Sequence, residues 1–250
     1  ALMLAMKKTG MFKVLSTGRV QAPALKIVVD REKEIRAFEP EPYWELGLIT
    51  KKPKIEAAHE NNKFFDKDAM EKSRKNTKGK AKVDDINTRE KTTYPVWPFD
   101  LGTLQSEAHT HFGYNPKRTL QIAQKLYLSG LISYPRTSSQ KLPAKIGYDK
   151  LLSRIEKMYP EAKELKGRKP RQGKKEDPAH PAIYPTGHQP KNLNPQQKKV
   201  YDLVVRRFMA TFGKPAKREH ITVVLNANDE KYRAHGARTL DPGWFKYYKD

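Results

Sequence analysis

The sequence contains no cysteine among its 250 residues. A disulfide framework and a cysteine-ligated zinc site are therefore excluded, and the composition fits a reducing compartment. Long hydrophobic runs are missing too: there is no stretch of about 18 apolar residues, and the apolar residues 1–6 lack the leader and cleavage site of a signal peptide. These absences predict a cytoplasmic protein that is not attached to a membrane, and we expect it to be a monomer.

Acidic side chains are scarce, with 28 Asp and Glu against 50 Lys and Arg, which gives a formal net charge of +22. Such an excess repels itself unless a polyanion neutralises it, so nucleic acid is the expected partner. Two basic stretches, residues 72–82 and 163–175, show no apolar rhythm. We interpret the first as a solvated loop that can reach a DNA backbone, and the second as a disordered surface loop, with an ordered DNA contact as the alternative.

Both ends of the chain are abrupt. Residues 1–6 have no initiator methionine and resemble the inside of an apolar helix, and residues 244–250 have the pattern of a strand. We therefore expect the sequence to be a fragment of a larger protein.

Residues 130–139, with the sequence GLISYPRTSS, place a tyrosine beside a cation and several small hydroxyls. Gly130 can end a preceding helix in the left-handed conformation, and Pro135 moves Tyr134 out of the α region. If the segment is extended, Tyr134 and Arg136 lie on the same side. A guanidinium can grip two phosphate oxygens while a phenolate attacks phosphorus. The alternative is a short buried strand with a core tyrosine and a surface arginine, which these ten residues taken alone favour.

Apolar residues at three- and four-residue steps predict a helix of about five turns over residues 20–38. Gly18 marks its start, and Arg19 and Gln21 lie in its first turn. Backbone N–H groups at a helix start, together with an arginine, make a seat for a phosphate. An ordinary surface arginine near a helix cap explains Arg19 equally well.

Two helices are expected before the tyrosine. One covers residues 103–109 and is ended by Gly113, and the next has Asn115 as its N-cap with a proline after it. Lys117 and Arg118 lie in the first turn of the second helix, where the helix dipole disfavours cations unless an anion lies nearby.

Further helices are expected around residues 149–158 and after Asn194, and alternating runs predict strands over residues 43–50, 54–59, 220–225 and 231–236. The helix after Asn194 has the clearest apolar face, and residues 205–207 are expected mostly outside it. That face consists of Val200, Leu203, Val204, Phe208 and Phe212.

Two isolated motifs have more than one interpretation. Asp66 and Asp68 form a D-x-D pair, which we assign to a helix cap rather than to a magnesium site. His180 lies in the stretch DPAHPAIYPT, where three prolines fix an extended chain. A lone histidine is more often structural than functional, and here both interpretations stay open.

Four separated blocks resemble the type IA DNA topoisomerases. Residues 15–25 (LSTGRVQAPAL) resemble the family pattern L-S-x-G-R-V-Q-S/T-P-x-L, and residues 98–108 (PFDLGTLQSEA) resemble P-F-x-T-x-x-L-Q-x-E-A. Residues 117–139 resemble the active-site block that ends in G-L/Y-I-S/T-Y-x-R-T-D/S-S, and residues 180–186 (HPAIYPT) resemble H-x-A-I-x-P-T. Residues 241–244 (DPGW) fit a pattern found farther along. The order and spacing of these blocks cover most of the chain.

The resemblance implies a nucleophile and its helpers. Tyr134 would attack a DNA phosphodiester and form a 5′-phosphotyrosine link, and Arg136 would hold the scissile phosphate or stabilise its charge. Transesterification conserves bond energy, so no ATP is needed, although a phenol, with an ordinary pKa of about 10, requires a nearby cation or base. Single-stranded DNA would be contacted by Arg19, Gln21, Gln124, Ser133, Thr137 and His180.

The resemblance also implies an α+β, multidomain architecture. Residues 1–40 would belong to a helical gate-base domain. Residues 41–95 and 218–250 would form a β-rich arch, and residues 96–217 would be a mostly helical, helix-turn-helix-like domain that carries Tyr134.

The sequence departs from the family pattern in two ways. Ser138 stands where many bacterial members have Asp, and the sequence around it resembles that of archaeal members. The family's N-terminal Toprim domain, which binds Mg²⁺, is absent, so we expect no metal site in this chain and no relaxation of supercoils by it alone. A non-catalytic DNA-binding module and the topoisomerase half of a reverse gyrase are the alternatives.

Overall fold

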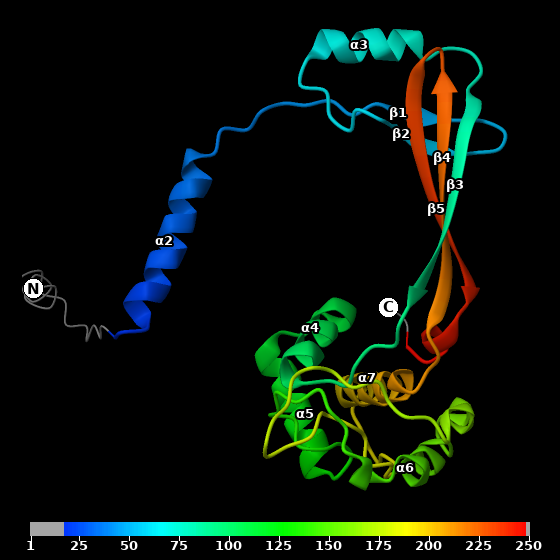
Figure 1. Ribbon diagram of the computed structural model, residues 1–250. Coiled ribbons are helices and arrows are strands. Elements are labelled where there is room, and N and C mark those ends of the chain that lie inside the picture. The colour runs from blue at the N-terminus through cyan, green and yellow to red at the C-terminus, as the bar shows by residue number, and fades with distance from the viewer. Residues whose placement is uncertain (1–17, 249–250) are drawn as a thin grey trace, which may run out of the picture.

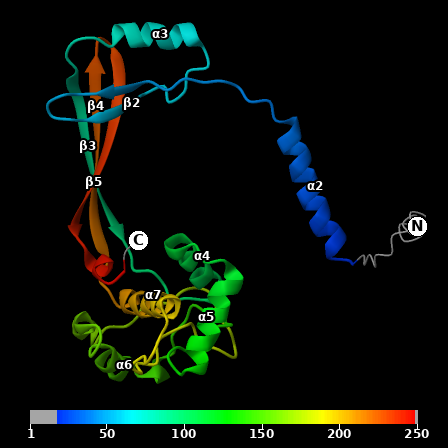
Figure 2. The same ribbon diagram turned by 180° about the vertical axis from the view of Figure 1, so that it is seen from behind.

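The computed structural model describes residues 18–248. Its first element, helix α2 (Gln21–Ala37), confirms the helix expected over residues 20–38. Figures 1 and 2 show α2 standing apart from the other elements, with an extended segment leading from it to the sheet. No residue of α2 is buried, and Leu25 and Ile27 are 63% and 72% exposed. The predicted apolar stripe is therefore formed but is not covered by other described residues.

A five-stranded antiparallel sheet with the strand order β1-β2-β5-β4-β3 follows. The strands β3, β4 and β5 form a long twisted ribbon, and β1 and β2 lie at one end of it (Figure 1). The four strand regions expected from the sequence are confirmed, whereas β3 is not predicted, because Val83 and Ile86 are its only large apolar side chains. The strands are β1 (Gly47–Ile49), β2 (Glu56–His59), β3 (Lys82–Thr93), β4 (Ala216–Ala227) and β5 (Glu230–Asp241).

A small hydrophobic core stabilises the end of the ribbon where β2 pairs with β5. His59 lies beside this core and is 4% exposed, and its Nε2 lies 2.9 Å from Glu230 Oε2. Helix α3 (Lys67–Asn76) lies at this end, and the Asp66 side chain caps it by accepting a backbone N–H, as expected. Because α3 runs to Asn76, the solvated loop predicted over residues 72–82 is wrong for its first part. The core consists of Ala57, Leu225, Tyr232 and Ala234.

The other helices and the loops between them form a separate body, which we call the helical unit (Figure 1). Three of its helices begin at side-chain caps: Asp100, Asn115 and Asn194 each accept a backbone N–H from the first turn. Asn115 and Asn194 agree with the predicted helix starts, whereas the first helix begins at Leu101, two residues before the expected start; Gly113 ends it as expected. No helix within residues 18–248 is long and apolar enough to cross a membrane. The helices are α4 (Leu101–Phe112), α5 (Pro116–Leu128), α6 (Tyr148–Ile155) and α7 (Pro195–Thr211).

Helix α7 is buried on more sides than its apolar stripe predicts. Val205 is fully buried and Arg207 is 5% exposed, so the expectation that they lie outside the packed face is wrong. Arg207 Nε donates to Trp97 O at 2.8 Å, and the guanidinium lies over the Phe99 ring at 4.6 Å. Its charge is balanced by Glu107, 3.5 Å away. The segment before α4 therefore covers a side of α7 that sequence periodicity assigns to solvent.

Two further regions differ from expectation. Residues 163–175 are ordered: they include the end of a 3-10 helix (Pro160–Leu165), Leu165 is fully buried, and Arg171 N–H donates to Thr211 O at 2.8 Å. A strand is expected over residues 244–250, but in the described part of that stretch the chain forms a 3-10 helix (Gly243–Lys246). Trp244, Tyr247 and Tyr248 are buried in the core of the helical unit, although the expected arch included them.

Candidate active site around Tyr134

The loop that carries Tyr134 begins where α5 ends. Gly130 has a φ of 68°, in the left-handed region expected of a residue that closes a helix. Leu131 N–H donates to Leu126 O at 2.9 Å, and the side chains of Leu131 and Ile132 are buried in the helical core. Tyr134 therefore follows two anchored residues, which limits how far its backbone can move.

A second segment, residues 180–186, is hydrogen-bonded to this loop. Ser133 N–H donates to Tyr184 O at 2.9 Å, and Tyr184 N–H donates to Ser133 Oγ at 3.0 Å. On the other side of the segment, Ile183 N–H donates to Phe99 O at 2.8 Å. The segment is thus held between the Tyr134 loop and the residues that lead into α4.

These hydrogen bonds bring His180 against Tyr134. The two ring centroids are 4.6 Å apart, with 37° between the ring planes. Tyr127 of α5 meets the Tyr134 ring edge-on at 5.3 Å. Tyr134 is half-buried, so aromatic neighbours fix its ring while part of it stays open to a substrate.

Ser133 and Thr137 use their hydroxyls within the protein. Ser133 Oγ donates to Ala182 O at 3.1 Å, and Thr137 Oγ1 donates to His180 O at 3.3 Å. Thr137 is 5% exposed. Both residues therefore position the segment that carries His180, and the DNA contact expected of them stays a prediction.

Asp177, the first residue of the stretch DPAHPAIYPT, places a carboxylate at the edge of the site, a role that the stretch itself does not indicate. Its Oδ1 accepts N–H groups from Ala179 at 2.9 Å and from His180 at 3.1 Å, and its Oδ2 lies 3.5 Å from Ser138 N and Oγ. The hydrogen bond from Ala179 is the main cause that lowers the pKa of Asp177 below its ordinary value. A charged carboxylate therefore stands beside Ser138, the position where the family pattern admits Asp.

Asp100, which is 2% exposed, lies behind the loop. Its Oδ1 accepts the N–H and hydroxyl of Thr103, both at 2.7 Å, and its Oδ2 accepts Gln140 Nε2 at 3.1 Å and lies 3.2 Å from Lys175 Nζ. Burial alone would raise the pKa of Asp100, but the hydrogen bonds from Thr103 and the bond and charge of Lys175 lower it overall. This network ties the start of α4 to the chain that follows Thr137.

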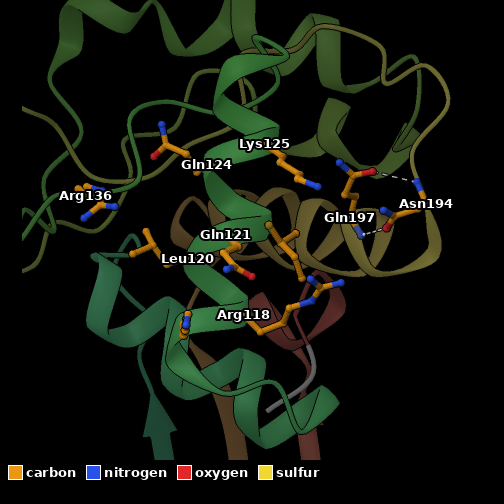
Figure 3. Close-up of a pocket in the computed structure, with 10 residues that line it drawn as sticks. Arg118, Leu120, Gln121, Gln124, Lys125, Arg136, Asn194 and Gln197 are labelled. Atoms are coloured by element: carbon orange, nitrogen blue, oxygen red, sulfur yellow. Dashed lines mark hydrogen bonds between the residues drawn. The ribbon is translucent and has the colours of Figure 1, made fainter.

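An open hollow of about 600 Å³ lies along α5, next to the loop (Figure 3). Gln124 and Arg136 lie on one side of α5, and Asn194 and Gln197 lie on the other. None of the lining residues is acidic, and the cations at the start of α5 are disfavoured there by the helix dipole. A bound anion would balance the charge of the lining cations and would offset the unfavourable interaction of Lys117 and Arg118 with the helix dipole. The lining cations are Lys117, Arg118, Lys125 and Arg136.

Gln124 has an unusual environment within this hollow. Its Oε1 is buried and has no hydrogen-bond partner among the described residues. A buried polar atom without a partner requires a specific explanation, and such atoms occur at functional sites. The site residues expected on α5 and in the loop, Gln124 and Arg136, therefore share one cationic surface.

The comparisons with known proteins agree with this geometry. A family model described as DNA topoisomerase matches residues 1–250. The chain belongs to the DNA topoisomerase family. DNA topoisomerase 1 of Pyrococcus horikoshii is 45% identical over 260 aligned residues, which cover 99% of this chain and 38% of that protein. DNA topoisomerase 3 of Caenorhabditis elegans is 34% identical over 247 residues, which cover 94% of this chain and 32% of that protein.

A solved structure is similar as well. Full-length topoisomerase I from Thermotoga maritima matches 95% of this chain and 41% of its own, with a TM-score of 0.69 and 30% sequence identity. These matches confirm the resemblance to type IA topoisomerases and the mixed α and β fold class. DNA topoisomerase 1 of Methanothermobacter thermautotrophicus is 45% identical over 96% of this chain and 34% of its own. Such archaeal relatives agree with the archaeal-like sequence around Ser138. The chain spans about a third of the length of the curated relatives it matches.

The topoisomerase chain does not bring all of its expected site residues together. Tyr134, Arg136 and His180 lie in or beside one loop. Arg19 and Gln21 lie at the start of α2, which both views place apart from α5 (Figures 1 and 2). Their contact with DNA therefore stays a prediction.

The described part of this topoisomerase chain offers no metal centre. Within residues 18–248, no group of three or more His, Asp or Glu side chains is placed to hold an ion. Asp66 caps α3. The Mg²⁺ implied by the family resemblance does not fit these residues, so we derive no chemical step through it.

Proposed function

We propose that this chain supplies the nucleophile and phosphate-binding surface of a type IA DNA topoisomerase, which cleaves and rejoins one DNA strand and thereby relaxes negative supercoils. The observation that carries this proposal is the position of Tyr134. Its ring is held between His180 and Tyr127, in the same loop as Arg136, which lines a hollow that has four cations and no carboxylate in its lining. A phenol and a guanidinium at one surface suit attack on a phosphodiester.

The chemistry follows from these groups. The Tyr134 oxygen forms a bond to phosphorus as the bond between phosphorus and the 3′ oxygen breaks. The phenol loses its proton, and the departing 3′ oxygen gains one. Arg136 holds the phosphate and stabilises its developing charge. The product is a 5′-phosphotyrosine, and the reverse attack by the 3′ hydroxyl rejoins the strand without ATP.

The partner we propose is single-stranded DNA, because the phosphate of a separated strand can enter the hollow beside Tyr134. Relaxation needs parts that the chain, at about a third of its relatives' length, does not include. We therefore infer that the isolated chain binds single strands without relaxing supercoils, and that Mg²⁺ is bound outside the described residues. A cytoplasmic location and a monomeric state remain predictions.

The test uses the full-length protein that contains this chain, with a labelled single strand and denaturing gels that detect a covalent protein–DNA adduct. Tyr134→Phe should reduce the adduct to background while single-strand affinity is kept. Tyr127→Phe is the matched control, since it removes a phenol whose ring centroid lies 5.3 Å from that of Tyr134. An adduct that survives in Tyr134→Phe would show that another residue is the nucleophile, and the absence of an adduct in the unaltered protein would favour a chain that only binds DNA.

A further inference from the structure

The carboxylate of Asp177 joins the two segments that meet at Tyr134. Its Oδ1 accepts the N–H groups of Ala179 at 2.9 Å and of His180 at 3.1 Å, within its own segment. Its Oδ2 lies 3.5 Å from the nitrogen and the Oγ of Ser138, which belongs to the Tyr134 loop. One carboxylate therefore contacts both the loop of the tyrosine and the segment of the histidine.

The sequence explains why Asp177 takes this position. Pro178 follows it and has no N–H group, so the first backbone donors within reach of the carboxylate are those of Ala179 and His180. An aspartate that accepts these N–H groups closes a turn, and the turn sets the direction in which the His180 side chain leaves the backbone. The hydrogen bond from Ala179 is the main cause that lowers the pKa of Asp177, and the charge of His180 acts in the same direction.

Asp177 also faces the ring of His180. The Nδ1 atom of this ring lies 3.9 Å from Asp177 Oδ1, which is too long for a hydrogen bond but close enough for the carboxylate to attract a protonated ring. The same ring lies against Tyr134, with 4.6 Å between the centroids. Within residues 18–248, no hydrogen bond or ion pair uses His180 Nε2. This second nitrogen is therefore left for an oxygen of the substrate.

Few ionisable groups surround the His180 ring. Tyr134 lies against it, Asp177 faces its Nδ1 atom, and Arg136 lines the hollow along α5. His180 also lines a second hollow, of about 610 Å³, in which Asp177 is the carboxylate within ion-pair distance of the ring. The ionisable side chains that line this second hollow with His180 are Lys141, Lys145, Glu176 and Asp177.

The cations of the chain leave Asp177 to this histidine. The sequence has 50 Lys and Arg, yet among residues 18–248 none of them forms an ion pair with Asp177. The adjacent carboxylate, Glu176, pairs with Lys141 instead. A carboxylate whose ion-pair partner in the described part of the chain is His180 points to a role at that ring.

We propose that Asp177 is a positioning residue of the cleavage reaction, which orients the His180 ring against Tyr134 and favours its positively charged form. Because the carboxylate also contacts Ser138, it fixes the histidine segment relative to the tyrosine loop. A positive ring beside Tyr134 adds to Arg136 in stabilising the charge that develops on the phosphate. This inference rests on the proposed function, in which Tyr134 is the nucleophile and His180 contacts the strand.

The first measurement is an NMR titration of the His180 ring in this chain, because it requires no activity. The His180 signal is identified by its loss in His180→Gln. Asp177→Asn keeps an oxygen that can accept the backbone N–H groups but removes the charge, so the midpoint of the His180 titration should fall by about half a pH unit or more. Glu176→Gln, the matched control, removes the same charge from the adjacent residue and should move the midpoint much less. Equal midpoints in the unaltered chain and in Asp177→Asn would overturn the proposal.

The second measurement follows formation of the covalent adduct by the full-length protein on a labelled single strand. Asp177→Asn should slow it about threefold or more near pH 8, the ratio that corresponds to a half-unit shift, and less near pH 6, where the ring stays protonated without the carboxylate. In a His180→Gln background, Asp177→Asn should have little further effect, because Asp177 acts through His180. Independent effects of the two changes, or equal slowing by Glu176→Gln, would contradict a positioning role.

Failure of this inference can be told from failure of the proposed function. If the unaltered full-length protein forms no adduct, the proposed function fails, and the titration still decides whether Asp177 acts on His180. If the adduct forms on Tyr134 but neither the titration nor the rate responds to Asp177→Asn, the proposed function stands and Asp177 only closes a turn.

Discussion

The helical unit and the ribbon are stabilised in different ways. In the helical unit, large side chains such as Leu104, Ile155 and Phe208 are almost completely buried in one continuous core. In β3, by contrast, no residue is buried, and the strand is held mainly by its pairing with β4 along eleven registered positions. Burial of apolar side chains contributes most to the free energy of unfolding of the helical unit. Backbone hydrogen bonds contribute most to that of β3 in the ribbon. Substitutions that remove buried side chains should therefore lower the free energy of unfolding mainly in the helical unit. Substitutions of charged side chains should have their effect mainly in the ribbon.

The largest expected effect is a packing change in the helical unit. Phe208 is 2% exposed and packs edge-on against Phe212 at 5.1 Å. Phe208→Ala should lower the free energy of unfolding by about 3–5 kcal/mol, because it leaves a cavity. Ile86→Ala in β3, where the side chain is 59% exposed, should change it by less than about 0.5 kcal/mol. Urea unfolding followed by circular dichroism measures both, and similar decreases in the two variants would break the comparison.

A smaller effect is expected at Asp100, and it depends on pH. The lowered pKa of Asp100 stabilises the folded state above the ordinary Asp pKa, about 3.9, and this stability is lost as pH falls through the lower folded pKa. Asp100→Asn should therefore cost about 1–2 kcal/mol at pH 7, through weaker hydrogen bonds at the start of α4, and should flatten the acid side of the stability profile.

Urea unfolding at a series of pH values between about 2 and 7 provides the measurement. Asp229→Asn, at the exposed turn between β4 and β5, is the control and should leave the profile as it is. An Asp100→Asn profile parallel to that of the unaltered chain would show that Asp100 contributes no pH-dependent stability.

The smallest expected effect concerns one glycine in each region. Gly130 has a φ of 68°, and an added Cβ would meet only His188 Nδ1 at 3.9 Å, so Gly130→Ala should cost about 1 kcal/mol through backbone strain alone. Gly236 in β5 lies in open space, so Gly236→Ala should change stability by a few tenths of a kcal/mol. Thermal unfolding resolves the difference, and equal shifts would indicate that the left-handed turn after α5 is not strained by a side chain.

Sequence periodicity and caps predict the helical unit well. Asn115, Asn194 and Gly130 mark helix ends in the sequence and do so in the structure. The ribbon is harder to predict, because β3 has polar residues on both faces and pairs through its backbone. The buried position of Arg207 could not be predicted either, since it depends on the segment before α4 folding over α7.

The candidate site shows the same division. The separate motifs of Tyr134 and His180 carry rings that the structure places 4.6 Å apart, whereas Arg136 lines the hollow along α5. The supporting groups Asp100 and Asp177 lie within the stretches PFDLGTLQSEA and DPAHPAIYPT, but those stretches do not indicate their bonds to Gln140, Lys175 and Ser138, which come from distant segments. Their roles became visible only with the tertiary arrangement.

The central claim is that Tyr134, rather than any neighbouring tyrosine, is the nucleophile. The most direct measurement traps the covalent adduct of the full-length protein with a single strand, digests it, and locates the attached nucleotide by mass spectrometry. We predict a 5′-phosphate ester on the peptide that contains Tyr134. An adduct on Tyr127, whose ring centroid lies 5.3 Å from that of Tyr134 and whose side chain is 38% exposed, would contradict the account.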